Sequence, residues 1–325
     1  MFAVYAAEPS PDDPLAALVV GERPDPEVPD GYVAVDVAAA TLNMHDLWTL
    51  RGVGITGEKF PMILGCDGAG TLADGTEVVV HGVISDLDLG GDETLDPNRT
   101  LLTENLQGTF ADTVVVPARN VVAKPPGMSW VQAATMPTAW LTAYRMLFTR
   151  AELRPGQTML VQGASGGVST ALVQLGRAAG LRVWVTGRTA DKRALAEKLG
   201  AHATFESNAR MPEKVDCVFE TVGEATWAHS IRSTKPGGTI VVSGATSGPN
   251  PPADLQRIFY YQLRVVGSMM GTLDELRDLL AFVDTAAITP EIGAVLPMER
   301  AEEGFRAMLA GDTAGKIVFT RDRSK

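Results

Sequence analysis

A glycine-rich turn between an apolar strand and a helix constrains the fold of this chain more than any other feature. The turn is Gly163-Ala164-Ser165-Gly166-Gly167-Val168. The strand Thr158–Val161 precedes it, the helix Val168–Ala179 follows it, and Leu181–Thr186 has the pattern of a second strand. Glycine lets the backbone turn tightly and approach phosphate oxygens, while the N–H groups and dipole of the helix attract the anion. This order of elements predicts a pyrophosphate-binding turn and disfavours the alternative of a flexible loop.

The second half of the chain alternates strands with helices. Ser129 can cap a helix whose apolar positions continue to Leu147. The expected strands are Thr158–Val161, Arg182–Thr186, Cys217–Glu220, Thr239–Ser243 and Leu263–Gly267, and the expected helices are Val168–Ala179, Asp191–Leu199, Thr226–Ser233 and Leu273–Asp284. Because parallel strands need crossover connections, this alternation predicts a doubly wound α/β sheet.

The first 125 residues contain short β-branched and aromatic runs divided by turn residues. The expected strands are Phe2–Ala6, Ala16–Val20, Tyr32–Ala39, Glu77–Val83 and Phe110–Val116. They predict a compact, mostly antiparallel β domain. The acidic and polar stretch Ser85–Asn105 is expected to be a surface loop, and the final strand Lys316–Thr320 is expected to return to this first domain.

Composition narrows the classes of function. At 325 residues the chain is long enough for two domains. Its 28 basic and 39 acidic residues give a net charge of −11, which argues against nucleic acid or an anionic membrane as the main partner. Cys66 and Cys217 are its only cysteines, so a disulfide framework or a four-cysteine zinc lobe cannot form. Without a leader pattern or a membrane-length apolar run, we expect a cytoplasmic protein.

Further segments form a series around the glycine turn. They are Leu42-Asn43-Met44-His45-Asp46-Leu47-Trp48, Pro61-Met62-Ile63-Leu64-Gly65-Cys66-Asp67-Gly68-Ala69-Gly70, Gln107-Gly108-Thr109-Phe110-Ala111, Leu199-Gly200-Ala201, Lys235-Pro236-Gly237-Gly238 and Gly315-Lys316-Ile317-Val318. In this order they resemble the medium-chain dehydrogenase/reductase superfamily, specifically its zinc-free quinone oxidoreductase branch. The resemblance implies a GroES-like β domain at 1–125 with 287–325 and a Rossmann domain at 126–286. It also implies a cleft between them where a nicotinamide cofactor meets its substrate.

The same resemblance allows the metal question to be examined residue by residue. Zinc-dependent relatives hold the catalytic metal with a cysteine, a histidine and a further cysteine, because such zinc needs three ligands and one open position. The matching positions here are Asn43, Cys66 and Thr138. One possible ligand does not make a site, so we expect no metal and expect Cys66 to be a small buried residue. His45 is expected to be a hydrogen-bonded structural residue.

Cofactor choice depends on the end of the second strand. Enzymes that prefer NAD place an acidic side chain there, which would repel a 2′-phosphate. Gly187 takes that place, and Arg188, Lys192 and Arg193 follow it. Guanidinium and ammonium groups suit a phosphate, so the sequence predicts NADPH rather than NADH. A solvated, basic start of the next helix is the alternative interpretation.

The resemblance implies further cofactor contacts from later strand ends, where ligands of a parallel sheet bind. Asn43 would hydrogen-bond the nicotinamide ribose, and Lys316 would close the cleft near the cofactor. The predicted cofactor-binding residues are Asn43, Thr138, Gly163, Ala164, Ser165, Gly166, Gly167, Val168, Gly187, Arg188, Thr189, Lys192, Val222, Gly244, Ala245, Thr246, Met269, Met270 and Lys316. Ordinary turn glycines, and a surface lysine at Lys316, are the alternatives.

The resemblance implies hydride transfer from NADPH to a quinone or an α,β-unsaturated carbonyl compound. Asn43 and Trp48 are the candidate residues on the substrate side, Asn43 for positioning and Trp48 for stacking on a flat substrate. A core aromatic is the alternative for Trp48. No general acid is assigned, and water can serve. An enoyl-thioester reductase and a non-catalytic NADPH-binding protein are the alternative functions, whereas a zinc alcohol dehydrogenase is disfavoured.

One further stretch bears on oligomeric state. Arg257–Val266 is long and apolar near the expected sheet edge. An uncovered edge strand tends to pair with another copy, so we expect a homodimer. The expected partners are therefore a small-molecule substrate and a second copy of the chain.

Overall fold

The computed structural model describes residues 1–85, 91–311 and 313–321. Packing divides the chain into two compact units. The β unit consists of residues 1–141 together with the segment from Gly271 onward, and the α/β unit consists of residues 142–270.

The boundaries of these units differ from the domain boundaries expected from the sequence. Helix α2 (Trp130–Ala134) packs on strands β3 (Tyr32–Thr41) and β5 (Gly68–Thr71). Helix α8 (Leu273–Thr285) packs on β10 (Val121–Ala123). Packing therefore assigns both helices to the β unit, whereas boundaries at 125/126 and 286/287 assign them to the other domain.

The β unit is built from two main sheets. The smaller has the order β2 (Leu18–Glu22), β1 (Phe2–Ala6) and β4 (Met62–Ile63). The larger has the order β10, β6 (Glu77–Val80), β5, β3, β18 (Lys316–Thr320) and β17 (Ile292–Pro297), with β9 (Thr113–Pro117) also paired to β3. The pairs are antiparallel except β17 with β18. The predicted, mostly antiparallel β domain is confirmed.

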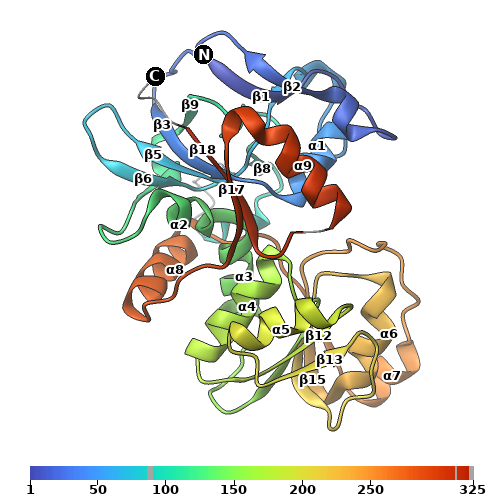
Figure 1. The fold of residues 1–325 in the computed structure, drawn as a ribbon. Helices are drawn as coiled ribbons and strands as arrows, with labels where there is room; N and C mark the ends of the chain where they lie inside the picture. The colour runs from blue at the N-terminus through green and yellow to red at the C-terminus, as the bar shows by residue number, and fades with distance from the viewer. Residues whose placement is uncertain (86–90, 312, 322–325) are drawn as a thin grey trace. The chain divides into compact units, whose positions relative to one another are not determined.

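The C-terminal strand lies inside this larger sheet, between β3 and the edge strand β17. Val318 pairs with Thr41, so β18 runs antiparallel to β3, as Figure 1 shows where the dark red and blue strands meet. Phe319 anchors β18 by packing edge-on against Phe110, with ring centroids 5.1 Å apart. Gly304 of helix α9 (Ala301–Ala310) lies against the Phe319 ring, because a Cβ at Gly304 would lie 2.7 Å from that ring. The predicted return of the C-terminus to the first domain is confirmed.

Several expected elements in this unit are shifted or divided. Pro14 begins a short 3₁₀ helix, so the strand expected at Ala16–Val20 starts only at Leu18. The expected strand Glu77–Val83 divides into β6 and β7 (Val83–Ile84), and the strand expected at Phe110–Val116 begins at Thr113. Helices α1 (Met44–Leu50) and α9 were not predicted.

The expected acidic surface loop is only partly loop. Residues 86–90 lie outside the described residues. The rest includes the 3₁₀ turn Glu93–Leu95 and strand β8 (Thr100–Leu101), which pairs with β7. The Glu93 carboxylate accepts the N–H of Leu273 at the start of α8. Part of this stretch is therefore packed against the body of the β unit.

The α/β unit is a six-stranded parallel sheet. Its order is β13 (Ala203–Glu206), β12 (Arg182–Gly187), β11 (Thr158–Gln162), β14 (Val215–Glu220), β15 (Thr234–Val242) and β16 (Arg264–Gly267). All five neighbouring pairs are parallel. Order and direction confirm the predicted doubly wound sheet. Strand β13 and helix α7 (Leu255–Tyr260) were not predicted.

Helices α4 (Gly167–Ala178), α5 (Ala190–Lys198) and α6 (Glu224–Ser233) connect the strands within one or two residues of their predicted bounds. Gly176 brings α4 close to the sheet, because a Cβ there would lie 2.5 Å from the Met159 sulfur. The predicted cap at Ser129 is confirmed, since its hydroxyl accepts the N–H of Gln132. Beyond α2 this helical stretch contains two π-helical segments, Met136–Trp140 and Arg145–Arg150.

Candidate functional site

The predicted phosphate turn joins β11 to α4. Gly163 has φ +86°, a conformation that favours glycine, and Gly166 is the N-cap of α4 without a side-chain hydrogen bond. The first helical hydrogen bond is donated by Thr170 to Gly166 O. The N–H groups of residues 167–169 therefore have no partner within the helix. A free helix start beside open glycines fits the pyrophosphate of a dinucleotide.

The end of β12 is packed too closely for a residue larger than glycine. A Cβ at Gly187 would lie 2.9 Å from the Ala164 Cβ, so a larger residue there would displace the phosphate turn. Arg188 is exposed, while Arg193 donates to Gly187 O at 2.9 Å. Thr189 is the N-cap of α5, where its hydroxyl accepts the N–H of Lys192. Of the two arginines, Arg193 fixes the turn, whereas the Arg188 side chain is exposed.

The turns after β14 and β15 are hydrogen-bonded to each other. Ser247 donates both its N–H and its hydroxyl to Val222 O, each at 2.7 Å. Gly223 has φ +92°, and a Cβ there would lie 2.5 Å from Gly248 O. Gly244 also lies close to Thr221, because a Cβ at Gly244 would be 3.0 Å from Thr221 O. The predicted contact residues Val222, Gly244, Ala245 and Thr246 thus form one continuous double turn at the carboxyl edge of the sheet.

The last predicted pair follows β16. Met270 is buried with φ +45°, and its sulfur lies 4.0 Å from the Thr142 hydroxyl. Met269 is partly exposed, and Ser268 donates its N–H to Val242 O at 2.8 Å. The segment therefore continues the carboxyl edge one strand beyond the double turn.

A fully buried carboxylate lies beneath the double turn. Glu220, the last residue of β14, accepts the N–H groups of Val222 at 2.8 Å and Gly223 at 3.0 Å. It also accepts the hydroxyls of Thr226 at 2.9 Å and Ser230 at 2.7 Å. Hydrogen-bond donors on both oxygens satisfy the charge that burial would otherwise penalise. Glu220 therefore holds the conformation of this turn.

Gln162 extends the same network to two more strand ends. Its amide N–H₂ donates to Ser230 and to His229 Nδ1, each at 2.9 Å, and its oxygen accepts from Thr186 at 2.6 Å. His229 Nε2 lies 2.8 Å from Ala209 O, so Nε2 carries the proton and Nδ1 accepts. Burial lowers the pKa of His229, in agreement with a neutral ring. The network connects the carboxyl ends of β11, β12 and β14.

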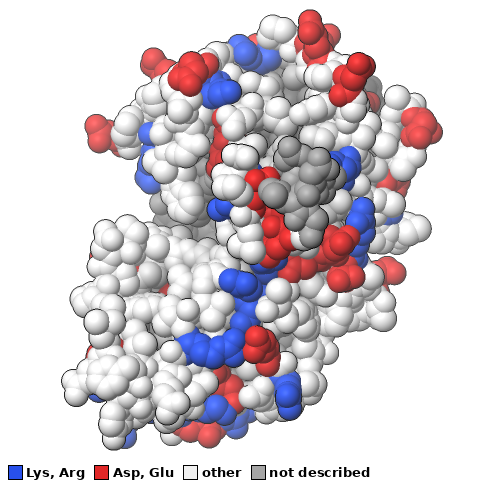
Figure 2. Space-filling view, turned by 180° about the vertical axis from the view of Figure 1, so that it is seen from behind, with Lys and Arg blue, Asp and Glu red and all other residues white. Residues whose placement is uncertain are grey.

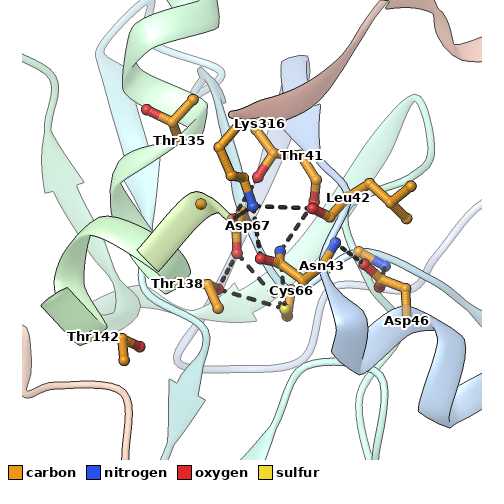
Figure 3. Close-up of polar contacts among 12 residues, drawn as sticks. Thr41, Leu42, Asn43, Asp46, Cys66, Asp67, Thr135, Thr138, Thr142 and Lys316 are labelled. Atoms are coloured by element: carbon orange, nitrogen blue, oxygen red, sulfur yellow. Dashed lines mark hydrogen bonds and ion pairs between the residues drawn. The ribbon is translucent and has the colours of Figure 1, made fainter. Parts of the chain in front are cut away.

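In the β unit, a second polar centre gathers around Lys316 (Figure 3). Lys316 is 3% exposed, and its ammonium group donates to Asn43 Oδ1 at 2.6 Å and to Leu42 O at 3.0 Å. It lies 3.4 Å from Asp67 Oδ2. This burial overturns the alternative of a surface lysine.

Asp67 and its neighbours complete the centre. The buried Asp67 carboxylate accepts hydrogen bonds from Thr41 at 2.5 Å and from Thr138. Cys66 Sγ lies 3.6 Å from Asn43 Nδ2 and 3.5 Å from the Thr138 hydroxyl. Burial raises the pKa of the Cys66 thiol well above its usual range, so the sulfur is a neutral thiol. The structure thus brings together the three residues that match zinc ligands in relatives.

Helix α1 begins at this centre. Asn43 is its N-cap, and Asp46 closes a capping box by accepting the Asn43 N–H at 2.8 Å. The other Asp46 oxygen accepts the Gly65 N–H at 2.8 Å. Burial raises the pKa of Asp46 to about 7, which outweighs the opposite effect of these two N–H groups. Asp46 thereby ties the start of α1 to the segment that carries Cys66.

Two other residues of α1 were singled out from the sequence. Trp48 is 37% exposed, so the alternative of a core aromatic is wrong. The His45 Nε2 atom is buried without a hydrogen-bond partner, and burial lowers the pKa of this ring. A hydrogen bond to the Leu102 backbone holds the ring, as expected for a structural histidine.

Comparison with known proteins identifies the family. Residues 29–126 match a family described as the alcohol dehydrogenase GroES-like domain, and residues 167–285 match one described as zinc-binding dehydrogenase. A zinc-type alcohol dehydrogenase-like protein of Schizosaccharomyces pombe is 30% identical, over 90% of this chain and 91% of that protein. The chain belongs to the medium-chain dehydrogenase/reductase family.

Two further relatives of this medium-chain dehydrogenase/reductase add to the comparison. A crotonyl-CoA carboxylase/reductase of Cereibacter sphaeroides is 29% identical, over 88% of this chain and 79% of that protein. A crystal structure of an NAD-dependent alcohol dehydrogenase is 32% identical with a TM-score of 0.90, covering 98% of this chain and 99% of that one. The predicted GroES-like and Rossmann domains are confirmed, and the chain is an oxidoreductase with a nicotinamide cofactor. The quinone oxidoreductase branch stays a prediction.

The family description raises the question of zinc, and the donor set here does not fit it. Lys316 can only donate, so the atom of Asn43 facing it is the oxygen, and the Asn43 N–H₂ group faces Cys66. An amide N–H₂ is not a zinc ligand, and the Thr138 hydroxyl is directed at Asp67. Within residues 1–85, 91–311 and 313–321, no three His, Cys, Asp or Glu side chains gather as a metal site would require.

Sequence reasoning missed several polar residues of both centres. Asp67, Thr41, Gln162 and Glu220 were not singled out as site residues. Asp67 follows Cys66 directly, and Glu220 ends a predicted strand. A carboxylate at either place could have indicated a site residue. Their roles depend on contacts between elements that are distant in the sequence.

The surface carries both signs of charge. Figure 2 shows basic and acidic side chains beside each other on one face. Surface ion pairs such as Arg264 with Glu152, 3.0 Å apart, are examples. None of the helices that the structure describes is long and apolar enough to cross a membrane. The cytoplasmic location stays a prediction.

Proposed function

We propose that this enzyme is an NADPH-dependent reductase that adds hydride to the C=C bond of an α,β-unsaturated thioester. The proposal rests on one observation: the chain is 29% identical, over 88% of its length, to a protein named crotonyl-CoA carboxylase/reductase. Crotonyl-CoA, the compound in that name, is an enoyl thioester. Among the functions expected from the sequence, this likeness supports the enoyl-thioester reductase more than the quinone reductase. The substrate class is therefore an acyl thioester with a conjugated double bond.

The reaction requires one hydride, one proton and a place for negative charge. Bound NADPH supplies the hydride. When the carbon β to the thioester receives it, negative charge develops on the thioester oxygen and a proton must reach the α carbon. The protein's part is to orient the reactants and exclude bulk water.

The residues of the β-unit centre are poorly suited to give that proton. The Cys66 thiol has a raised pKa, and both Asp46 oxygens are occupied by backbone N–H groups. The His45 Nε2 atom is buried away from solvent. We therefore assign the proton to water.

Cofactor choice follows from the end of β12. Gly187 leaves no room for the acidic side chain that would bind the ribose hydroxyls of NAD, because a Cβ would meet Ala164. Arg188 is exposed at the same turn and can pair with a 2′-phosphate. The free N–H groups of the α4 start hold the pyrophosphate, the double turn at Val222 contacts the nicotinamide end, and Asn43 bonds the ribose.

A quinone is the second candidate substrate, favoured by one observation. The Trp48 indole is 37% exposed on α1, so its face is available to stack on a flat ring. An enone has the same conjugated C=C–C=O unit as the thioester and is reduced by the same chemistry.

A homodimer through β16 is part of the proposal. Among the described residues, this edge strand of the α/β unit pairs only with β15, and Val265 is exposed on it. Phe259 and Tyr260 of the adjacent α7 are each 70% exposed. A free strand edge beside exposed aromatic rings fits a second copy of the same edge.

The decisive experiment measures NADPH oxidation with crotonyl-CoA, cyclohexenone and phenanthrenequinone, against a control without substrate. We expect the highest kcat/KM with crotonyl-CoA. Turnover of the quinone alone would replace the proposal by the second candidate. Tight NADPH binding without turnover of any of the three would favour a non-catalytic protein. Zinc content is measured on the same preparation, and stoichiometric zinc would overturn the zinc-independent mechanism.

A further inference from the structure

The Lys316 ammonium group has a full set of acceptors although it is almost completely buried. Its three contacts are Asn43 Oδ1 at 2.6 Å, Leu42 O at 3.0 Å and Asp67 Oδ2 at 3.4 Å. An ammonium group has three N–H bonds, so each can be directed at one acceptor. Lys316 thus has no N–H left to offer a ligand, and any effect it has on the reaction must pass through these partners.

The main partner is the Asn43 amide. Because Lys316 holds Oδ1, the N–H₂ group of Asn43 must point the other way, toward Thr41 O at 3.2 Å and Cys66 Sγ at 3.6 Å. A carbonyl oxygen such as Thr41 O accepts only from a donor, which gives the same orientation independently. Asn43 as a whole residue is 8% exposed. Lys316 thereby selects one of the two amide orientations of Asn43.

The negative charge of Asp67 explains why this centre needs a cation. Asp67 is fully buried, and its other side-chain contacts, the Thr41 and Thr138 hydroxyls and the Cys66 thiol at 3.6 Å, are neutral groups. A buried carboxylate is stable only when it is paired or well hydrogen-bonded. In zinc-dependent relatives the dication supplies positive charge to this group of positions. In this chain Lys316 supplies it, from a strand 273 residues away from Asn43 in the sequence.

We infer that Lys316 is the positioning residue of this centre. Its ammonium group supplies the positive charge that a metal ion supplies in zinc-dependent relatives. It also fixes Asn43 in the orientation that contacts the cofactor. This inference rests on the proposed role of Asn43 toward NADPH. It goes beyond that role because it names Lys316 as the residue that holds the Asn43 amide. It also gives this centre a cation that is part of the chain, the lysine ammonium group, where a bound metal ion could exchange.

The test is a double-mutant cycle in a charge-balanced background. Lys316→Met alone would leave Asp67 uncompensated and endanger folding, so the paired variant Lys316→Met/Asp67→Asn is used. Its NADPH dissociation constant is measured by nicotinamide fluorescence, and its kcat and KM are measured with crotonyl-CoA. Thermal unfolding is recorded for every variant. Asn43→Ala is then introduced into the wild type and into the paired variant.

We expect the paired variant to unfold near the wild-type temperature but to bind NADPH about tenfold more weakly, the loss of one hydrogen bond between Asn43 and the cofactor. Asn43→Ala should weaken binding about tenfold in the wild type. In the paired variant it should change binding less than about twofold, because residues that act as a unit are not additive. Equal effects of Asn43→Ala in both backgrounds would overturn the inference, as would wild-type binding by the paired variant.

The chain offers a matched control. Lys124 is also buried, donates to Met128 O at 2.6 Å and to Pro125 O at 3.2 Å, and lies 2.8 Å from Glu77. Lys124→Met/Glu77→Gln removes an ion pair between a buried lysine and an exposed glutamate, three and two strands away from β3 in the same sheet, and should leave NADPH affinity unchanged. If this control weakens binding equally, the effect of Lys316 is general destabilisation and the inference falls. Because NADPH affinity needs no substrate, the cycle decides the role of Lys316 even if crotonyl-CoA is not reduced.

Discussion

Glu220 accepts a hydrogen bond from the backbone N–H of Val222 at 2.8 Å, so the last residue of β14 holds the turn that follows it. The same carboxylate accepts three further groups, from Gly223, Thr226 and Ser230. We expect Glu220→Gln to lower the free energy of unfolding by about 1–3 kcal/mol, because an amide N–H₂ would face donors. It should also raise the KM for NADPH.

Denaturation and cofactor kinetics of the purified variant check this. Glu197→Gln is the control, since Glu197 is an exposed glutamate of the same unit that accepts one hydroxyl, from Thr204. Unchanged stability of Glu220→Gln would remove Glu220 from the structural basis of the turn.

Stability should depend on pH through Asp46. Its pKa is about 7 in the folded protein and 3.8 in the reference state, so between these values the folded state binds more protons than the unfolded state. Stability from this group is therefore greatest at low pH and is lost as the pH rises from about 4 to 7, by about 1.4 kcal/mol per pH unit at most.

Asp46→Asn removes this titration. Relative to the wild type, the variant should gain stability as the pH rises through that window and show a constant difference above it. Urea denaturation of both proteins at several pH values measures the difference, with exposed Asp74→Asn as the control. A difference that does not change with pH would contradict the raised pKa of Asp46.

Arg188→Ala should reduce the preference for NADPH. Loss of one charge-assisted contact to the 2′-phosphate is expected to raise the KM for NADPH about tenfold and to leave the KM for NADH nearly unchanged. Arg232→Ala, at an exposed arginine on α6, serves as the control. Better use of NADH than of NADPH by the wild type would defeat the prediction of cofactor choice.

Disruption of the β16 edge should yield a monomer. Val265→Lys combined with Phe259→Glu places charges on the exposed edge and should halve the mass measured by light scattering. Val295→Lys changes an exposed valine of the β unit and should leave the mass unchanged. A wild-type protein of monomer mass would reject the homodimer.

Much of the fold could be read from local patterns. The glycine turn, the Ser129 cap and helix α4 were predicted within a few residues, because each depends on neighbours along the chain. Helix α1 was missed although Asn43 and Asp46 form a capping box. Its seven residues are too few for a periodic apolar pattern to be distinguished from a turn.

The sequence by itself determined the phosphate turn, the alternation of strands and helices, and the absence of an acidic residue at Gly187. Only the tertiary structure decided what Lys316 does. Its neighbours in the sequence are compatible both with a surface lysine and with a residue of the cleft. In the structure, pairing of β18 with β3 buries Lys316 against Asn43 and Asp67. A buried charge acquires its role from the partners that satisfy it, and those partners come from strands that are distant in the sequence.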